Sequence, residues 1–377
     1  MKKLLRYPLI ILFTLIVFGF TVLDTFTHDK SYSQLENRVL VQRPNPTLEK
    51  IISNEYTKDY EEYIDDQILG RDEWIDIKSR VEFILAKVEN NGIIYGTDHY
   101  LFEKYKIMNE TRLNKNVNFI MEFIKDCKYP VTFGIIPNSY MKNQDKLPYG
   151  LDNLNQYTYI NDIDDKIKKI NNNNGKETEI LNLNDLNLKY YKTDHHWTTQ
   201  GAYIAYEQLM KQYSLPIISV EQLSEFKKVE KDFYGSYFNK CKVFNAEPDI
   251  ITYYDIPIER VTIDGKDKNG IYDFSKLKSR DKYGMFLYGN NGITKIISNN
   301  KINKTDKKTK ILIIKDSYAN CFTPFLTYNF DEVTVIDLRS IGVKLSDYLN
   351  ENEFDKVLIL YNFKSLANDV NIAKIIF

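Results

Sequence analysis

A short stretch in the middle of the chain places one carboxylate beside two imidazoles. Residues 192–201 read KTDHHWTTQG, so Asp194, His195 and His196 are consecutive and hold two of the chain's four histidines. In an extended or turning segment, residues i and i+2 point the same way, so the Asp194 carboxylate can orient the His196 imidazole. An imidazole oriented in this way is the base that activates a weak nucleophile such as a serine hydroxyl.

A candidate nucleophile follows far downstream, in KILIIKDSYAN (310–320). Ser317 comes directly after an apolar run that is typical of a buried strand. Functional groups of open α/β sheets gather beyond the carboxyl ends of the strands, where the free N–H groups of the next helix also lie. A serine at such a position is often only a helix N-cap. With His196 as base and Asp194 as its orienting group, Ser317 instead becomes the nucleophile of an acyl-transfer site.

An acyl-transfer site also needs hydrogen-bond donors for the oxyanion of its transition state. The stretch FLYGNNG (286–292) offers the backbone N–H of Gly289 and the side-chain amide of Asn290. An Asn-Gly dipeptide is also typical of a tight turn, and the two interpretations can hold for the same loop.

Metal binding is the alternative interpretation of the two adjacent histidines. Neighbouring histidines rarely share one ion, and the sequence has neither HxxxH nor CxxC spacing that would supply further ligands. Its three cysteines lie far apart, which indicates neither a zinc ribbon nor a disulfide framework. We therefore expect no metal and no cofactor, and we expect His195 to support the site or to contact substrate.

Other polar residues are expected near the same sheet edge. Asn138 and Tyr140 follow a predicted strand at 131–137, and Arg339 follows another at 332–338. We predict that they bind substrate, although each is of a type that often has a purely structural role. Tyrosines between 230 and 290 could supply stacking surfaces for sugars.

The rest of the chain alternates between strand-like and helix-like segments. Nearly continuous apolar runs predict buried strands at 131–137, 177–185, 311–316, 332–338 and 356–362. Helices are predicted between them, at 109–127, 158–170, 199–213, 318–328 and 343–351. This alternation predicts an α/β fold with a central parallel sheet. The polar, tyrosine-rich stretch at about 214–300 is expected to be an insertion near the active face.

The N-terminus predicts a membrane anchor. Basic residues precede an apolar run over 8–23, and no small-x-small cleavage site follows. We expect a signal-anchor helix over 1–24, a stalk over 25–46 and a catalytic domain over 47–377 outside the cell membrane. A cleaved secretory signal is the alternative, and it would export the same domain. The net charge of −1 gives no indication of nucleic-acid binding.

Three motifs resemble those of the DHHW protein family, namely TDHHWTTQGA, FLYGNNG and IIKDSYANCFTPFL, in this order. The resemblance extends from SQLENRVL (33–40) and IDDQILGRDEWIDIK (64–78), through NGIIYGTDHYLF (91–102), to the last predicted strands. That family is similar to the alginate O-acetylation proteins, which have SGNH-hydrolase-like folds. The resemblance therefore implies a three-layer α/β/α domain of this kind.

The resemblance also implies roles for individual residues. Ser317 would be the nucleophile, His196 the base and Asp194 its orienting group, while Asn290 and Gly289 would bind the oxyanion. Relatives of this kind act outside the cytoplasm on polysaccharides, some beside a membrane-bound O-acyltransferase that supplies acetyl groups. We therefore expect a polysaccharide O-acetyltransferase. The alternatives are an O-acetyl esterase with the same residues, and a polysaccharide-binding component without catalysis.

Overall fold

The computed structural model describes residues 7–33, 38–151, 153–171, 175–299, 302 and 307–376. The chain forms two compact units, Met1–Lys87 with Lys242–Phe244, and Val88–Cys241 with Asn245–Phe377. The basic residues Lys2, Lys3 and Arg6 of the predicted anchor lie outside the described residues. Where the predicted stalk and catalytic domain meet stays a prediction.

The first unit is built from helices. They are α1 (Pro8–Phe26), α2 (Leu48–Ile52), α3 (Glu55–Gln67) and α4 (Arg71–Ile84), with β1 (Tyr32–Ser33) and β2 (Arg38–Val39) as a small antiparallel pair. Gly70 separates α3 from α4 with a φ of 70°, a left-handed conformation that glycine adopts without strain. The turn after α3 therefore occurs where the sequence places a glycine.

Among the described helices, α1 is the one that is long and apolar enough to cross a membrane. Its side chains are not buried by the rest of the protein. The hydroxyls of Thr21 and Thr25 donate to carbonyl oxygens one turn back, those of Val17 and Thr21, so these polar groups are satisfied within the helix. The helix thus has the properties of a membrane anchor or of a signal sequence.

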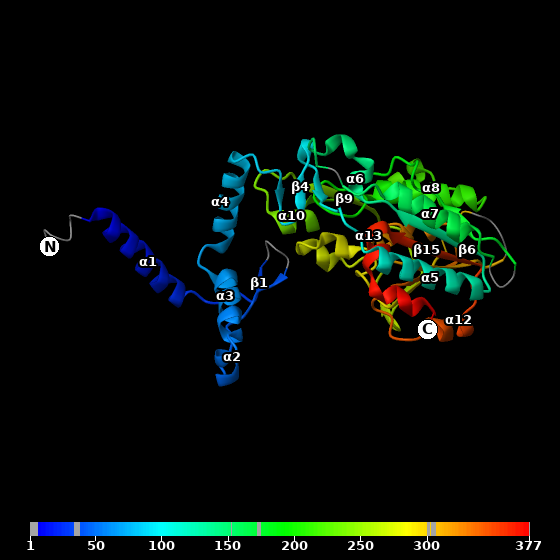
Figure 1. Cartoon of the computed structure of the whole chain (residues 1–377). Helices are drawn as coiled ribbons and strands as arrows, with labels where there is room; N and C mark the ends of the chain where they lie inside the picture. The colour runs from blue at the N-terminus through cyan, green and yellow to red at the C-terminus, as the bar shows by residue number, and fades with distance from the viewer. Residues whose placement is uncertain are drawn as a thin grey trace. The chain divides into compact units, whose positions relative to one another are not determined.

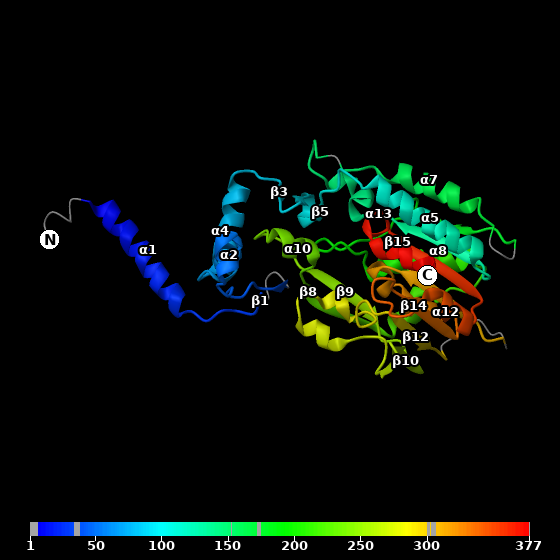
Figure 2. The same ribbon diagram turned by 60° about the horizontal axis from the view of Figure 1, so that its bottom comes forward.

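The second unit contains an eight-stranded sheet (Figures 1 and 2). In spatial order its strands are β11 (Lys266–Lys268), β10 (Arg260–Ile263), β12 (Ile293–Ile297), β14 (Glu332–Ile336), β13 (Lys310–Lys315), β15 (Lys356–Asn362), β6 (Val131–Ile136) and β7 (Glu179–Leu181). The strands from β14 to β7 are parallel, and β12, β10 and β11 extend the sheet in antiparallel fashion. All five predicted strands are present and parallel to one another, so the predicted central parallel sheet is confirmed, and the three antiparallel strands are an addition to it.

Helices cover both faces of this sheet (Figure 1). One face packs on α5 (Glu110–Asp126), α7 (Gln156–Lys168), α12 (Leu345–Glu351), α13 (Phe363–Asn368) and the 3-10 helix η7 (Val370–Ile376). The other packs on α8 (Thr199–Gln212) and α11 (Thr323–Leu326). Successive residues of β13 alternate between the two cores, Ile311 and Ile313 facing one and Leu312 and Ile314 the other. This burial on both faces explains why β13 is apolar from Ile311 to Ile314.

The stretch at 214–300, expected to be an insertion, has two different parts. Its first part forms α9 (Val220–Ser224), a separate pair of β8 (Lys227–Phe233) and β9 (Asp249–Tyr254), and α10 (Ser236–Cys241). Its second part supplies the three antiparallel strands of the main sheet, seen together in Figure 2. This second part is therefore integral to the sheet. The short strands β3 (Glu89–Asn90), β4 (Ile93–Tyr95) and β5 (Leu101–Glu103) form a small antiparallel sheet.

Helix α8 packs very closely on the segment that leads to Asp194. Thr198 caps the helix by accepting the N–H of Gly201, and its own N–H donates to the carbonyl oxygen of Lys189. A Cβ added at Gly201 would lie 2.3 Å from this same oxygen. Only glycine permits this approach, which fixes the segment before the candidate site.

We predict that Gly201→Ala destabilises the protein. Alanine gains about 1 kcal/mol of helix propensity over glycine, but the clash is with a backbone oxygen that cannot move independently. Overpacking of this kind costs about 1–3 kcal/mol beyond that gain. Urea unfolding would measure the change, with Gly342→Ala as control because its Cβ would meet nothing within 4 Å. An unchanged midpoint for Gly201→Ala would contradict the predicted close contact.

Candidate active site

Ser317 lies just beyond the carboxyl end of β13 and begins the 3-10 helix η6 (Ser317–Asn320). The residue that caps this helix is Asp316, whose Oδ1 accepts the N–H of Tyr318 at 3.0 Å. Its Oδ2 accepts the N–H of Asn362 at the end of the neighbouring strand β15, at 2.9 Å. The N-cap alternative for Ser317 is therefore wrong, and the serine hydroxyl is available for another partner.

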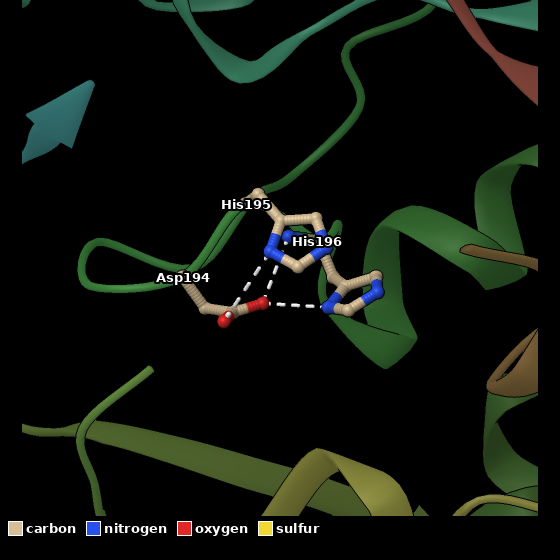
Figure 3. A group of neighbouring side chains, drawn as sticks. All are labelled: Asp194, His195 and His196. Carbon is tan, nitrogen blue, oxygen red and sulfur yellow. Dashed lines mark hydrogen bonds and ion pairs between the residues drawn. The ribbon is translucent and has the colours of Figure 1, made fainter. Parts of the chain in front are cut away.

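A continuous chain of hydrogen bonds joins Ser317, His196 and Asp194. Nε2 of His196 is 2.8 Å from Oγ of Ser317, and Nδ1 of the same ring is 2.6 Å from Oδ1 of Asp194 (Figure 3 shows the second contact). The carboxylate and the hydroxyl thus lie at opposite nitrogens of one imidazole. Such an arrangement lets the ring accept a proton from the serine while the carboxylate stabilises the imidazolium.

The Asp194 carboxylate is held by backbone groups as well as by His196. Oδ1 accepts the backbone N–H of His196 at 2.9 Å, and Oδ2 accepts that of Ser236, the first residue of α10, at 2.7 Å. Gly235 packs directly against it, since a Cβ at this position would lie 2.2 Å from the Cβ of Asp194. These contacts fix the carboxylate in one orientation.

Further contacts attach the histidine loop to its surroundings. Asp249 at the start of β9 accepts the backbone N–H groups of Lys192 and Thr193, both at 2.8 Å. Nε1 of Trp197 donates to the carbonyl oxygen of Tyr318 at 2.7 Å, which ties the loop to the turn that carries Ser317. Sequence reasoning missed Asp249, because its partners lie on a segment remote in sequence.

His196 is packed between two other rings. The Tyr283 ring is stacked on it, with ring centres 3.7 Å apart and planes 9° apart, and the His195 ring lies 3.7 Å away. The Tyr283 hydroxyl donates to the carbonyl oxygen of Ser317 at 3.1 Å. Tyr283 thus contacts both His196 and Ser317. Sequence reasoning identified only the tyrosine-rich segment that contains it.

His195 forms a second histidine–serine contact. Its Nδ1 is 2.6 Å from Oγ of Ser236 and 3.6 Å from Oδ2 of Asp194, so the same ring nitrogen faces both groups (Figure 3 shows the carboxylate). A proton relay needs the carboxylate and the hydroxyl at opposite ring nitrogens. The geometry therefore favours Ser317 over Ser236 as the activated hydroxyl, and it places His195 as a supporting residue.

The charges of the site favour a neutral His196. Burial and the neighbouring His195 lower the pKa of His196 to about 4. Burial also opposes ionisation of Asp194, but attraction and hydrogen bonds from the two histidines hold its pKa well below the usual value. For His195, the effect of burial is outweighed by Asp194, which raises the pKa of this imidazole. At neutral pH, His196 is then an unprotonated base beside an ionised carboxylate.

The two residues predicted to bind the oxyanion differ in whether their N–H groups are already hydrogen-bonded. The N–H of Gly289 donates to the carbonyl oxygen of Phe286 at 3.0 Å, so it is already engaged and does not fit the expected role. Oδ1 of Asn290 accepts from Nζ of Lys315 at 3.1 Å and from Nδ2 of Asn320 at 3.2 Å. Because the lysine ammonium can only donate, the atom of Asn290 that faces Lys315 must be the amide oxygen. Asn290 therefore stays a predicted donor through its amide nitrogen.

A cavity of about 500 Å³ adjoins the site, with His195, Tyr318, Asn138 and Arg339 among its lining residues. Other lining residues come from β5, α10 and the C-terminal segment: Glu103, Ser236, Tyr237, Lys240, Asn362, Lys364, Ser365, Asn368 and Asp369. The wall thus combines charged groups, amides and tyrosine rings, which suits a hydroxyl-rich ligand. Sequence reasoning missed its C-terminal part, because no motif there indicates chemistry.

The three remaining predicted binding residues have different surroundings. Asn138 is buried at the cavity, where its Oδ1 accepts from Gln156 and Asn362. Arg339 forms a bidentate ion pair with Asp337, at 2.8 and 2.6 Å. Tyr140 is not among the cavity residues. Its side chain is buried and its hydroxyl donates to the carbonyl oxygen of Leu154, so its role in binding substrate stays a prediction.

Asp194, His195 and His196 could in principle hold a metal ion, since one ligand atom of each lies within 4.8 Å of the others. However, the carboxylate oxygens already accept from His196 and from the N–H of Ser236, and the outer nitrogen of His196 faces Ser317. A metal would have to displace these hydrogen bonds. The donor set thus fits a hydrogen-bonded relay better than a metal centre.

The profile of the DHHW protein family matches residues 88–336. The chain belongs to the DHHW family. This match includes Asp194, His196 and Ser317, whereas Arg339 and the cavity residues from Asn362 onward lie beyond it. No curated protein matches the chain.

Solved structures share the fold. A DHHW family protein from Eubacterium siraeum superposes with a TM-score of 0.62 at 22% identity, covering 76% of this chain and 96% of that one. PatB1 of Bacillus cereus with a sulfonyl adduct gives 0.57 at 19% identity, covering 74% and 97%. The O-acetyltransferase domain of Pseudomonas putida AlgJ gives 0.45 at 14% identity, covering 75% and 98%. The likeness to the first two structures shows a shared fold, and the predicted three-layer α/β/α arrangement is confirmed.

The electrostatics of the site give a prediction for histidine titration. We expect His196 to stay neutral until the pH falls to about 4, and His195→Asn to raise its pKa, because a neighbouring positive charge is removed. Imidazole chemical shifts followed by NMR across acid pH would measure this. His99→Asn is the control, since His99 contacts residues 245 and 247 rather than the site. A titration of His196 near the usual histidine value would contradict the predicted shift.

Proposed function

We propose that this DHHW protein is an extracytoplasmic O-acetyltransferase that modifies a cell-surface or secreted polysaccharide through an acyl-serine. The single observation that carries the proposal is the hydrogen-bonded order Asp194–His196–Ser317 at the carboxyl edge of the sheet. Family membership and the SGNH-hydrolase-like fold support it. No cofactor enters the proposed chemistry.

In the first step, Ser317 Oγ attacks the carbonyl carbon of an acetyl donor while its proton passes to Nε2 of His196. The imidazolium formed is stabilised by the Asp194 carboxylate at Nδ1. The amide nitrogen of Asn290 is our candidate donor to the oxyanion, and the N–H of Ser317, in the first turn of η6, is a second. Collapse of the intermediate expels the leaving group, which takes the proton back from His196 and leaves an acetyl ester on Ser317.

In the second step, a sugar hydroxyl attacks the acetyl ester and gives its proton to the same nitrogen of His196. Ser317 then leaves and recovers that proton, so the acetyl group has moved and the protein is unchanged. The sugar must compete with water, and binding in a fixed pose supplies an effective concentration of about 10⁵ M or more. The polar and aromatic walls of the cavity, with Tyr237 and Lys364, are our candidate for this binding.

The proposed location follows from α1. We infer that α1 anchors the chain in the cell membrane with the second unit outside, where a membrane-bound O-acyltransferase would supply acetyl groups. The apolar composition and the exposure of α1 support an anchor. If the chain stays with membranes after a salt wash and an external protease digests its C-terminal part in intact cells, this orientation holds. A mature chain that begins near residue 25 in the medium would replace the anchor by a cleaved signal.

The proposed nucleophile can be tested by chemical labelling. A sulfonyl fluoride should form a sulfonate ester on Ser317, and Ser317→Ala should lose both this label and at least about a thousandfold of the ester turnover. Peptide mass spectrometry would locate the label. Ser236→Ala is the matched control, because Ser236 also contacts a histidine, and its variant should keep the label on Ser317. Label on Ser236 with Ser317 unmodified would reject the proposed nucleophile.

Transfer and hydrolysis can be separated by the fate of acetyl from an activated ester. An acceptor oligosaccharide should divert acetyl from free acetate to sugar, and Lys364→Ala should reduce this diversion roughly tenfold if cavity contacts fix the sugar. Lys168→Ala on α7 is the control for lysine loss away from the cavity. Mass spectrometry would quantify both products. If acetylated polysaccharide loses its esters and no oligosaccharide gains one, the protein is an O-acetyl esterase. If the protein binds polysaccharide without any ester turnover, only a binding role is left.

A further inference from the structure

Helix α4 in the first unit exposes its apolar residues and buries two polar ones. Trp74, Ile77, Val81 and Ile84 are 52%, 50%, 49% and 79% exposed, whereas Ser79 and Glu82 are only 4% and 9% exposed. The four apolar residues are spaced by three, four and three positions, so they form one face, here called the α4 stripe. A surface helix normally has the opposite arrangement. An exposed apolar face of this kind marks a contact surface.

The buried polar side of α4 is fixed by contacts within its own unit. Oγ of Ser79 accepts the N–H of Phe244 at 3.0 Å, and Oε1 of Glu82 forms an ion pair with Lys87 at 2.8 Å. Phe83 packs edge-to-face on Phe244, with ring centres 5.3 Å apart. Phe244 therefore packs on this side of the helix, and the stripe faces elsewhere.

The start of α4 is attached to the end of α1. The rings of Phe20 and Trp74 are 6.3 Å apart in an edge-to-face arrangement. Oδ1 of Asp24 accepts the N–H of Leu69 at 2.8 Å, and Nε1 of Trp74 donates to the carbonyl oxygen of the same leucine at 3.2 Å. The first turn of α4 is thus held beside the last turns of α1.

This attachment determines the depth of Trp74 if α1 crosses a membrane. Phe20 precedes Asp24 by four residues, which is about 6 Å along a helix. A carboxylate avoids the hydrocarbon core, so Asp24 marks the boundary with the headgroups. Trp74 then lies at this boundary, where tryptophan is enriched because its ring is apolar and its N–H is polar.

We propose that the α4 stripe binds the lipid surface of the membrane that α1 crosses, with its apolar side chains in the boundary between headgroups and acyl chains. This inference rests on the anchor of the proposed function and is independent of the acyl chemistry. A second copy of the chain is a weaker fit, because α4 has 14 residues and a coiled coil needs an apolar repeat over more heptads. The contact with α1 favours lipid instead.

The test places a fluorescent reporter on each side of α4 in the full-length protein. Of the chain's two tryptophans, Trp197 is fully buried in the second unit, and Trp74→Phe removes the other while keeping an aromatic ring beside Phe20. In that background, Ile84→Trp reports from the stripe. Phe83→Trp reports from another side of the helix, where Phe83 packs on Phe244 and is 50% exposed. The proteins are reconstituted in phosphatidylcholine vesicles that carry bromine atoms near the headgroup end of the acyl chains, and insertion of α1 is checked by resistance to alkaline washing.

We expect bromine to reduce the emission of Ile84→Trp roughly twofold, because interfacial helices bury their apolar face about 5–10 Å into the boundary. Phe83→Trp and the Trp74→Phe background should keep their emission. If washed vesicles retain the protein but Ile84→Trp is not quenched, the inference is overturned and the anchor stands. A dimer found in that case would assign the stripe to a second copy of the chain. Equal quenching at both positions would overturn the assigned face. Loss of the protein in the wash would contradict the anchor and this surface together.

Discussion

The Asp194 carboxylate is the group around which the candidate site is organised. One of its oxygens faces the ring and the backbone of His196, and the other accepts the first N–H of α10. Burying an ionised carboxylate is costly unless every oxygen is paired, and here the pairing groups are fixed by the main chain. Gly235 packs closely on Asp194, because a Cβ at this position would lie 2.2 Å from the Cβ of the aspartate. The position of the His196 ring thus depends on a carboxylate that is held in one orientation.

Two segments that are 121 residues apart in sequence meet at His196 and Ser317. Besides that contact, three side chains bridge them through backbone carbonyl oxygens: Trp197 binds that of Tyr318, the Tyr318 hydroxyl binds that of His195, and the Tyr283 hydroxyl binds that of Ser317. Hydrogen bonds to main-chain oxygens hold the turns themselves, so the approach of the His196 segment to the Ser317 segment does not depend on one side-chain rotamer. This gives the site its preorganisation.

The sequence predicted the parts of this arrangement that rest on local rules. The strand before Ser317 was found because a strand buried on both faces is apolar at every position, and Asp194 was paired with His196 because residues i and i+2 share a side. The strands β10 and β12 were missed because their residues alternate in burial and their partners are distant in sequence. The use of the Gly289 N–H and the burial of Tyr140 depend on tertiary contacts that residue type does not reveal. The same holds for the cavity wall after Asn362.

The antiparallel extension of the sheet has a consequence for the behaviour of the molecule in solution. The sheet ends at β11, a strand of three exposed residues, Lys266, Asp267 and Lys268. An open edge offers unpaired backbone groups to any other strand, and short, charged edge strands discourage such pairing because lysines would have to lose water and approach one another. This edge of the sheet is thereby protected against pairing with the sheet of a neighbouring molecule.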